Sequence, residues 1–138
     1  MNVFVDTNIL LDVLARREPF YADSARIWTL AETGQVTGFA STLSLPNLFY
    51  LLRRAKSRPT ARKTIGILRD IFSLVPLDVQ ITNQAIDSDI ADFEDAIEHF
   101  SALRAGAHVL LTRNPGDFFH HDVAIQTPVE FPATHFAQ

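Results

Sequence analysis

Apolar positions in this chain alternate between short continuous runs and longer stretches in which they recur with helical spacing. The short runs predict strands over residues 3–5, 36–40, 74–77 and 109–111, with a possible last strand over 123–125. The periodic stretches predict helices over residues 9–14, 22–31, 46–52, 61–72 and 90–105, and a short helical turn over 82–86. Because strands and helices alternate, the pattern favours an α/β fold, a three-layer sandwich with a mostly parallel sheet.

Glycine and proline residues mark where several of these elements end or weaken. Gly34 and Gly106 are expected to end the helices that precede them. Gly38 weakens the second strand, and Pro76 interrupts the third, which is therefore expected at an edge of the sheet. The residues from about 127 onward are interpreted as a tail.

The first strand run ends at Asp6, and helical spacing resumes at Ile9. Thr7 or Asn8 is expected to cap this helix, because a short side-chain oxygen there accepts from the free N–H groups of the first turn. Asp6 therefore falls where a parallel strand ends and a helix begins, at the edge of an open α/β sheet where ligands bind. On this stretch alone, Asp6 is equally compatible with a capping role and with a functional one.

The composition is that of one ordinary globular domain covering residues 1–138, with 47% hydrophobic and 20% charged residues. The absence of cysteine excludes a disulfide framework and a thiolate metal site. The N-terminus has no basic leader, and Asp6 and Asp12 break its apolar run, so neither a signal peptide nor a membrane-spanning segment is expected. A cytoplasmic protein without membrane contact is therefore expected.

The charged residues are segregated along the chain, which the formal net charge of −4 conceals. Seven of the twelve basic residues form a basic arm: Arg53, Arg54, Lys56, Arg58, Arg62, Lys63 and Arg69. Six acidic residues crowd the stretch that follows: Asp87, Asp89, Asp92, Glu94, Asp95 and Glu98. The basic arm suits phosphate binding or an acidic partner better than a merely solvated helix. Beside an acidic cluster, it suits a site that holds a metal and a polyanion together.

Three acidic residues from distant parts of the chain are expected at one edge of the sheet. Asp6 ends the first strand, Asp117 lies in the loop after the fourth, and Asp95 lies early in the helix that leads into that strand. Mg²⁺ prefers oxygen ligands and keeps several waters, so two or three carboxylates are enough to hold it. Asp92 lies one turn before Asp95, so both carboxylates can share a helix face. The alternative interpretation of residues 92–98 is a solvated helix face with favourable charges near its N-terminus.

Other chemistry has less support in the sequence. No glycine pattern of a P-loop or a dinucleotide site occurs. His99 has no partner at metal-ligand spacing, and the neighbouring His120 and His121 are interpreted as surface residues. A Rossmann-like phosphatase also begins with a strand ending in aspartate, but it usually has a second aspartate two residues later, where this chain has Asn8.

Four segments together resemble the PIN domain: VFVDTNILLD, STLSLPNLFYLL, DFEDAI and LLTRNPGDF. The resemblance covers residues 2 to about 125 and is strongest to the single-domain prokaryotic type, similar to the VapC toxins of toxin–antitoxin pairs. It implies a Rossmann-like α/β/α sandwich with a ribonuclease site that depends on Mg²⁺ or Mn²⁺. In such a site Asp6 corresponds to the first acidic residue and Asp95 to the third, with Asp92 as the alternative.

Two positions depart from the family's pattern. The second acidic residue, usually a glutamate, falls on Asn47, and the fourth falls on Asn114, with Asp117 three residues later as the expected substitute. Amides can bind a metal-bound water or a phosphate, but they add no negative charge. Asp6, Asp95 and Asp117 therefore remain as the charged metal ligands, and metal affinity is expected to be lower than is usual for the family.

The resemblance implies a metal-dependent endoribonuclease, the toxin of a VapBC-type pair. In this hypothesis Asn47 and Asn114 orient waters or the scissile phosphate, while Arg113, Arg53 and Arg54 contact phosphates of the RNA. The partners implied are an RNA substrate, a small antitoxin protein and a second copy of the chain in a homodimer. The alternative is a catalytically weakened PIN fold that binds RNA or another protein.

Overall fold

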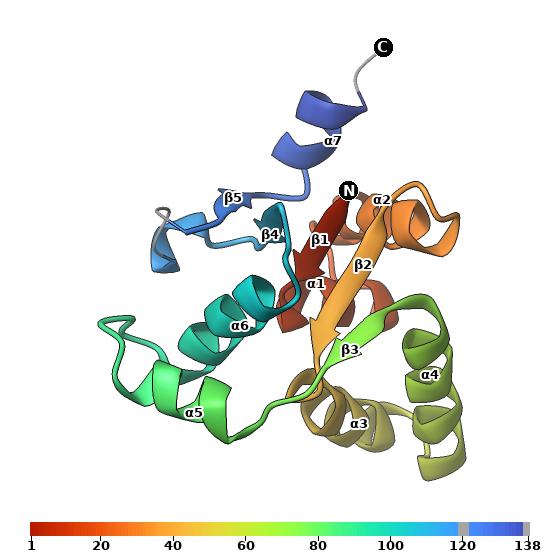
Figure 1. Cartoon of the computed structure of the whole chain (residues 1–138). Coiled ribbons are helices and arrows are strands. Elements are labelled where there is room, and N and C mark those ends of the chain that lie inside the picture. The colour runs from red at the N-terminus through yellow and green to blue at the C-terminus, as the bar shows by residue number, and fades with distance from the viewer. Residues whose placement is uncertain (119–121, 137–138) are drawn as a thin grey trace.

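The computed structural model describes residues 1–118 and 122–136, and within them five strands form one parallel sheet (Figure 1). The strand order is β3-β2-β1-β4-β5. The strands are β1 (Asn2–Val5), β2 (Thr37–Ser41), β3 (Ser73–Val75), β4 (Val109–Leu111) and β5 (Ala124–Gln126). The expected parallel sheet is confirmed, and β3 is an edge strand, as Pro76 predicts.

Helices cover both faces of the sheet, so the fold is a three-layer α/β/α sandwich. The helices are α1 (Thr7–Leu14), α2 (Tyr21–Glu32), α3 (Ser44–Ala55), α4 (Arg58–Ile71), α5 (Val79–Ile86), α6 (Phe93–Arg104) and α7 (Glu130–His135), with a 3₁₀ turn at Pro115–Asp117. Helices α5 and α6 lie on one side of the sheet, and α1 and α2 lie on the other (Figure 1). None of the helices in the described part of the chain is both long and apolar enough to cross a membrane.

The central strand β1 is buried on both faces, as its continuous apolar run predicts. Val3 and Val5 point into the core layer beneath α1 to α4, whereas Phe4 points into the layer beneath α5 and α6. All three side chains are fully buried. The strand therefore provides a rigid support for the residue that follows it, Asp6.

Three local expectations are wrong. The cap of α1 is Asp6 itself, whose side chain accepts from the backbone N–H of Asn8. The helix expected from residue 90 begins at Phe93, because Asp92 caps it. The supposed tail from about residue 127 contains α7, and Phe131 of this helix is fully buried in the core.

Three of the glycines occupy positions that require this residue, for different structural reasons. Gly34 and Gly106 have positive φ angles of 77° and 65° just after α2 and α6, which confirms them as helix-ending residues. A Cβ at Gly38 would lie 2.7 Å from the ring of Phe72. The glycine in β2 is therefore needed for close packing, and a larger residue would displace the ring.

His120 and His121 lie outside the described residues.

Candidate acidic site

The candidate site lies at the carboxyl ends of β1 and β4, where the strand order changes direction and open α/β sheets bind ligands. Asp6 follows β1 and is nearly buried, and its backbone N–H donates to the Leu111 carbonyl at 3.0 Å. The Thr112 hydroxyl, which follows β4, donates to Asp6 Oδ2 at 2.9 Å. These two contacts fix the first acidic residue against the neighbouring strand, 106 positions away in the sequence.

A cavity of about 370 Å³ opens at this point, and five carboxylates line it: Asp6, Asp92, Glu94, Asp95 and Asp117. Asn47, Asn114, Thr7 and Thr112 contribute polar groups to its wall. None of the described residues that line it is a lysine or an arginine. The structure thus brings the three predicted carboxylates Asp6, Asp95 and Asp117 to one cavity, together with the two predicted amides.

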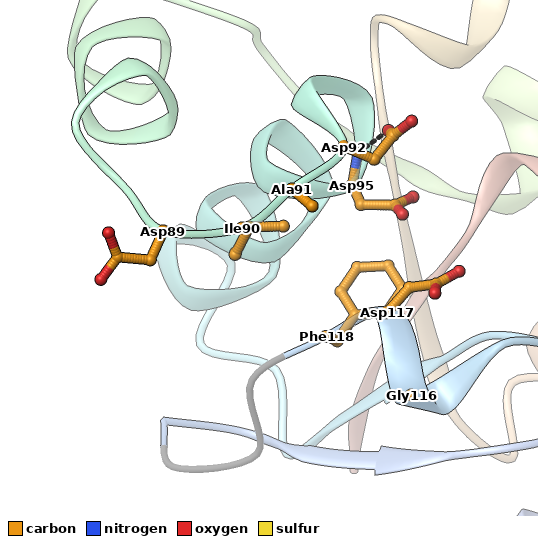
Figure 2. Close-up of a pocket in the computed structure, with 8 residues that line it drawn as sticks. All are labelled: Asp89, Ile90, Ala91, Asp92, Asp95, Gly116, Asp117 and Phe118. Carbon is orange, nitrogen blue, oxygen red and sulfur yellow. Dashed lines mark hydrogen bonds between the residues drawn. The ribbon is translucent and has the colours of Figure 1, made fainter.

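The N-terminus of α6 presents three of these carboxylates, those of Asp92, Glu94 and Asp95. Asp92 caps the helix, and its Oδ1 accepts from the backbone N–H of Asp95 at 2.9 Å. A second hollow of about 470 Å³ adjoins the first and shares Asp92, Asp95 and Asp117 with it. Figure 2 shows these three carboxylates turned to the same side, whereas Asp89 points away from them. Both hollows are therefore lined by carboxylates of α6 together with that of Asp117.

The gathered negative charge changes the protonation of the site. The pKa of Asp95 is raised to about 7, first by burial and then by repulsion from the neighbouring carboxylates Asp92, Asp6, Asp117 and Glu94. The pKa of Glu94 is also raised, first by burial and then by repulsion from Asp92 and Asp6. Perturbed carboxyl groups that share a cavity are typical of functional sites.

The two amides belong to the site but have different contacts. Asn47, in the first turns of α3, donates through Nδ2 to Glu94 Oε1 at 3.2 Å. Asn114 lines the same cavity, and its backbone N–H donates to the Thr112 hydroxyl at 3.1 Å. Asn47 is therefore linked to the Glu94 carboxylate of α6, and this hydrogen bond opposes the rise in the pKa of Glu94.

Comparison with known proteins identifies the family. The family model described as "PIN domain" matches residues 2–116. The chain belongs to the PIN domain family. This match spans most of the sequence and includes Asp6, Asp95 and Asn114.

Solved structures share the fold of this PIN domain at low sequence identity. VapBC2 from Rickettsia felis, bound to a promoter DNA fragment, has a TM-score of 0.68 and 17% identity over 92% of this chain and 98% of that one. A toxin–antitoxin complex from Klebsiella pneumoniae has a TM-score of 0.69 and 18% identity over 91% of this chain and 97% of that one. VapC20 from Mycobacterium tuberculosis, a Sarcin-Ricin loop cleaving toxin, has a TM-score of 0.62 and 18% identity over 78% of this chain and 86% of that one. The comparison with curated proteins found no match.

The donor set of this PIN domain fits a hard divalent cation in kind. The oxygen ligands and the excess of carboxylates favour an ion such as Mg²⁺ or Mn²⁺. However, within residues 1–118 and 122–136 no three His, Cys, Asp or Glu side chains stand close enough together to hold a metal ion. Asp6, Asp95 and Asp117 thus share a cavity without forming a preassembled coordination sphere, so the side chains would have to close around the ion.

Sequence reasoning missed one carboxyl group, that of Glu98. In the sequence it is one member of the acidic stretch, but its side chain is 1% exposed, so a solvated helix face is wrong for this residue. Its Oε1 accepts from the Thr7 backbone N–H at 3.0 Å and from the Thr7 hydroxyl at 2.8 Å. Burial raises its pKa well above the ordinary value, and Asp6 raises it further. The available signal was its place one helical turn after Asp95.

Arg113, expected to contact phosphate, is engaged elsewhere. Its Nε lies 3.0 Å from Oδ2 of the fully buried Asp12, and its guanidinium lies 3.8 Å from the ring centroid of Phe20. It lines a separate pocket with Phe20 and does not line the acidic cavity. The expectation for Arg113 is therefore not supported by its position, and its side chain instead joins the loop after β4 to α1.

Arg53 and Arg54 remain exposed near the end of α3. Each guanidinium carbon lies 5.7 Å from the ring centroid of Tyr50, a half-exposed residue one turn earlier. Neither arginine lines the acidic cavity, although Leu51 and Asn47 of the same helix do. The two arginines thus extend away from the rim of the cavity along the helix that borders it.

Proposed function

We propose that this PIN domain is a metal-dependent endoribonuclease that hydrolyses RNA phosphodiester bonds. The observation that carries the proposal is the gathering of Asp6, Asp95 and Asp117 in one cavity at the switch point of the sheet, with no basic residue among the described lining. A site with this much unbalanced negative charge favours cations, and a cation lets it accept a phosphate.

The proposed division of labour follows from the contacts. Asp6, Asp95 and Asp117 would hold Mg²⁺ or Mn²⁺, and such an ion, when bound, supplies Lewis acidity toward water and the phosphate. Thr112 fixes the orientation of Asp6 through its 2.9 Å hydrogen bond. The amide of Asn114 lines the wall and is suited to orient a water or the scissile phosphate. Asn47 would share this role and steadies Glu94.

The RNA would extend from the cavity along α3. Arg53 and Arg54 lie beyond the cavity rim on that helix, where guanidinium groups can contact phosphates. Tyr50 beside them offers a ring on which a base can stack. These contacts would position the strand and add affinity that depends on salt.

We further propose that the protein acts in the cytoplasm as the toxin of a VapBC-type pair. Structures of toxin–antitoxin complexes share its fold, which supports a small antitoxin protein as a partner. A homodimer is proposed as the assembly. A small reading frame next to the gene, encoding a DNA-binding antitoxin whose co-expression relieves growth arrest, would support this role. Normal growth on expression of the chain alone would contradict it.

The test of the enzymatic proposal is cleavage of structured RNAs in the presence of Mn²⁺. The wild-type protein should cleave, and both EDTA and Asp6→Asn should abolish cleavage. Asp70→Asn is the matched control, because Asp70 is an exposed aspartate on α4 whose only described ion pair is with Arg69. Equal cleavage by the wild type and Asp6→Asn would rule out the assigned site.

A second candidate function is an RNA- or protein-binding module that does not cleave. Asn47 and Asn114 at usually acidic positions favour it, as does the absence of three coordinating side chains close together in the described residues. Calorimetric titration with Mn²⁺ separates the two functions. The enzyme should bind Mn²⁺ in a manner that Asp95→Asn weakens, whereas the binding module should show no such dependence on Asp95.

A further inference from the structure

Glu98 lies directly behind the acidic cavity rather than in its wall. It belongs to α6, one turn after Asp95, and its side chain is 1% exposed. It does not line the cavity, yet its acceptor oxygen contacts Thr7, the residue after Asp6. A buried carboxyl group is costly in an apolar interior. The contacts of this group show what it does there.

The contacts of Glu98 join three helices beneath the site. Its Oε1 accepts from the backbone N–H of Thr7, the first residue of α1, at 3.0 Å and from the Thr7 hydroxyl at 2.8 Å. The Thr7 hydroxyl also lies 2.5 Å from the hydroxyl of Ser44, the first residue of α3. Helices α1, α3 and α6 are thus linked through one carboxyl oxygen and two hydroxyl groups.

Each of these helices carries a residue of the candidate site. Asp6 caps α1, Asn47 lies three residues after Ser44 on α3, and Asp95 lies three residues before Glu98 on α6. The network therefore sets the relative placement of groups that are 41 or more positions apart in the sequence. The second carboxyl oxygen of Glu98 is buried and has no hydrogen-bond partner within the described residues. A buried oxygen without a hydrogen bond is costly to the folded protein.

We propose that Glu98 is a positioning residue that holds the start of α1, and with it Asp6, against α6 and α3. This inference rests on the proposed function, since its consequence is the affinity of the site for a divalent cation. Groups that orient metal ligands typically change metal affinity tenfold to a hundredfold when they are lost. Glu98 interacts with the Asp6 carboxyl group, which raises its pKa, but the hydrogen bonds of its Oε1 go to Thr7 rather than to Asp6, so the smaller effect is expected here.

The experiment measures Mn²⁺ binding by calorimetry and by electron paramagnetic resonance, without RNA. Glu98→Ala should raise the Kd for Mn²⁺ by about tenfold. Glu98→Gln retains the acceptor oxygen and should stay within about threefold of the wild type. Leu68→Ala is the control for loss of stability alone, because Leu68 is fully buried on α4 and does not line the cavity. It should lower the melting temperature and leave the Kd unchanged.

The outcomes separate the two proposals. Absence of Mn²⁺ binding by the wild type overturns the proposed function. Binding by the wild type that is unchanged in Glu98→Ala overturns the positioning role alone, and so does a Glu98→Gln variant that binds as weakly as Glu98→Ala. If Glu98→Ala does not fold, Thr7→Val replaces it, because valine removes the hydroxyl that joins Glu98 to Ser44 but keeps the backbone N–H. An unchanged Kd in Thr7→Val also overturns the inference.

Discussion

Asp95 should destabilise the metal-free protein at neutral pH. In the folded state its pKa is about 7, chiefly because of burial, whereas the ordinary value is 3.8. Between these values the folded protein retains a proton that the unfolded chain releases, so the free energy of unfolding falls as the pH rises from about 4 to about 7. Replacing Asp95 by Asn removes the titrating group and should remove this loss of stability.

The magnitude follows from the shift. A difference of about three pKa units corresponds to roughly 4 kcal/mol, at 1.36 kcal/mol per unit. Asp95 is only partly buried and faces an open cavity, so solvent screening reduces this figure to about 1–2 kcal/mol. For a chain of this size, 1 kcal/mol changes the melting temperature by about 3–5 °C. Asp95→Asn should therefore melt several degrees above the wild type.

The assay is urea unfolding in EDTA at pH 4.5 and at pH 8, followed by circular dichroism. Asp95→Asn should exceed the wild type by about 1–2 kcal/mol at pH 8 and by much less at pH 4.5. Asp70→Asn, at an exposed position on α4, should follow the wild type at both values. Mn²⁺ should reverse the order at pH 8, because binding at a hundred times the Kd adds about 2.7 kcal/mol to the wild type.

Two results would refute this reasoning. If Asp95→Asn is no more stable than the wild type at pH 8, burial and the neighbouring carboxylates do not penalise the charged form of Asp95 enough to matter. If Asp70→Asn gains as much stability as Asp95→Asn, the gain comes from the overall negative charge of the protein rather than from the cavity.

Three further predictions concern residues outside the acidic cavity. Arg113→Met leaves Asp12 buried without its cation and should lower the free energy of unfolding in urea by about 3–5 kcal/mol at pH 8. The loss should be smaller at pH 5, because burial raises the pKa of Asp12, so that its carboxyl group is protonated more readily in the folded protein than in the unfolded chain. Gly38→Ala should lower the free energy of unfolding by about 1–3 kcal/mol, measured in the same assay, because its Cβ would overlap a packed aromatic ring. Replacing both Arg53 and Arg54 by Ala should weaken RNA binding about equally for all sequences. In a filter-binding titration, the slope of log K against log salt concentration should become shallower by the equivalent of up to two phosphate contacts.

The fold could be predicted from the sequence because its signals are local. The apolar run before Asp6 reads as a strand buried on both faces, and that is how β1 lies. The glycines after α2 and α6 end those helices through their left-handed backbone conformation, which few other residues adopt. The shared edge of Asp6, Asp95 and Asp117 follows from the rule that parallel strands bring their carboxyl ends together.

The remaining features depend on partners that are distant in the sequence. No residue near Glu98 in the sequence indicates that its side chain contacts Thr7. A glutamate in an acidic stretch is instead expected to be exposed to solvent. Arg113 follows the fourth strand, next to the expected site, but its side chain contacts the buried Asp12 and the ring of Phe20 and lines a separate pocket. The helix at the C-terminus is too short for periodicity to reveal it, and only the burial of Phe131 shows that it packs.

The hydrogen bond between Thr112 and Asp6 joins residues 106 positions apart, across the two strands at the middle of the sheet. During synthesis on a ribosome the first of these strands is made early, but its neighbour on this side is made only when about four fifths of the chain is complete. Such long-range pairing closes late and slowly in folding. A nascent or truncated chain therefore has no assembled acidic cavity, and a cell translating this gene meets the complete site only after the last strands have docked.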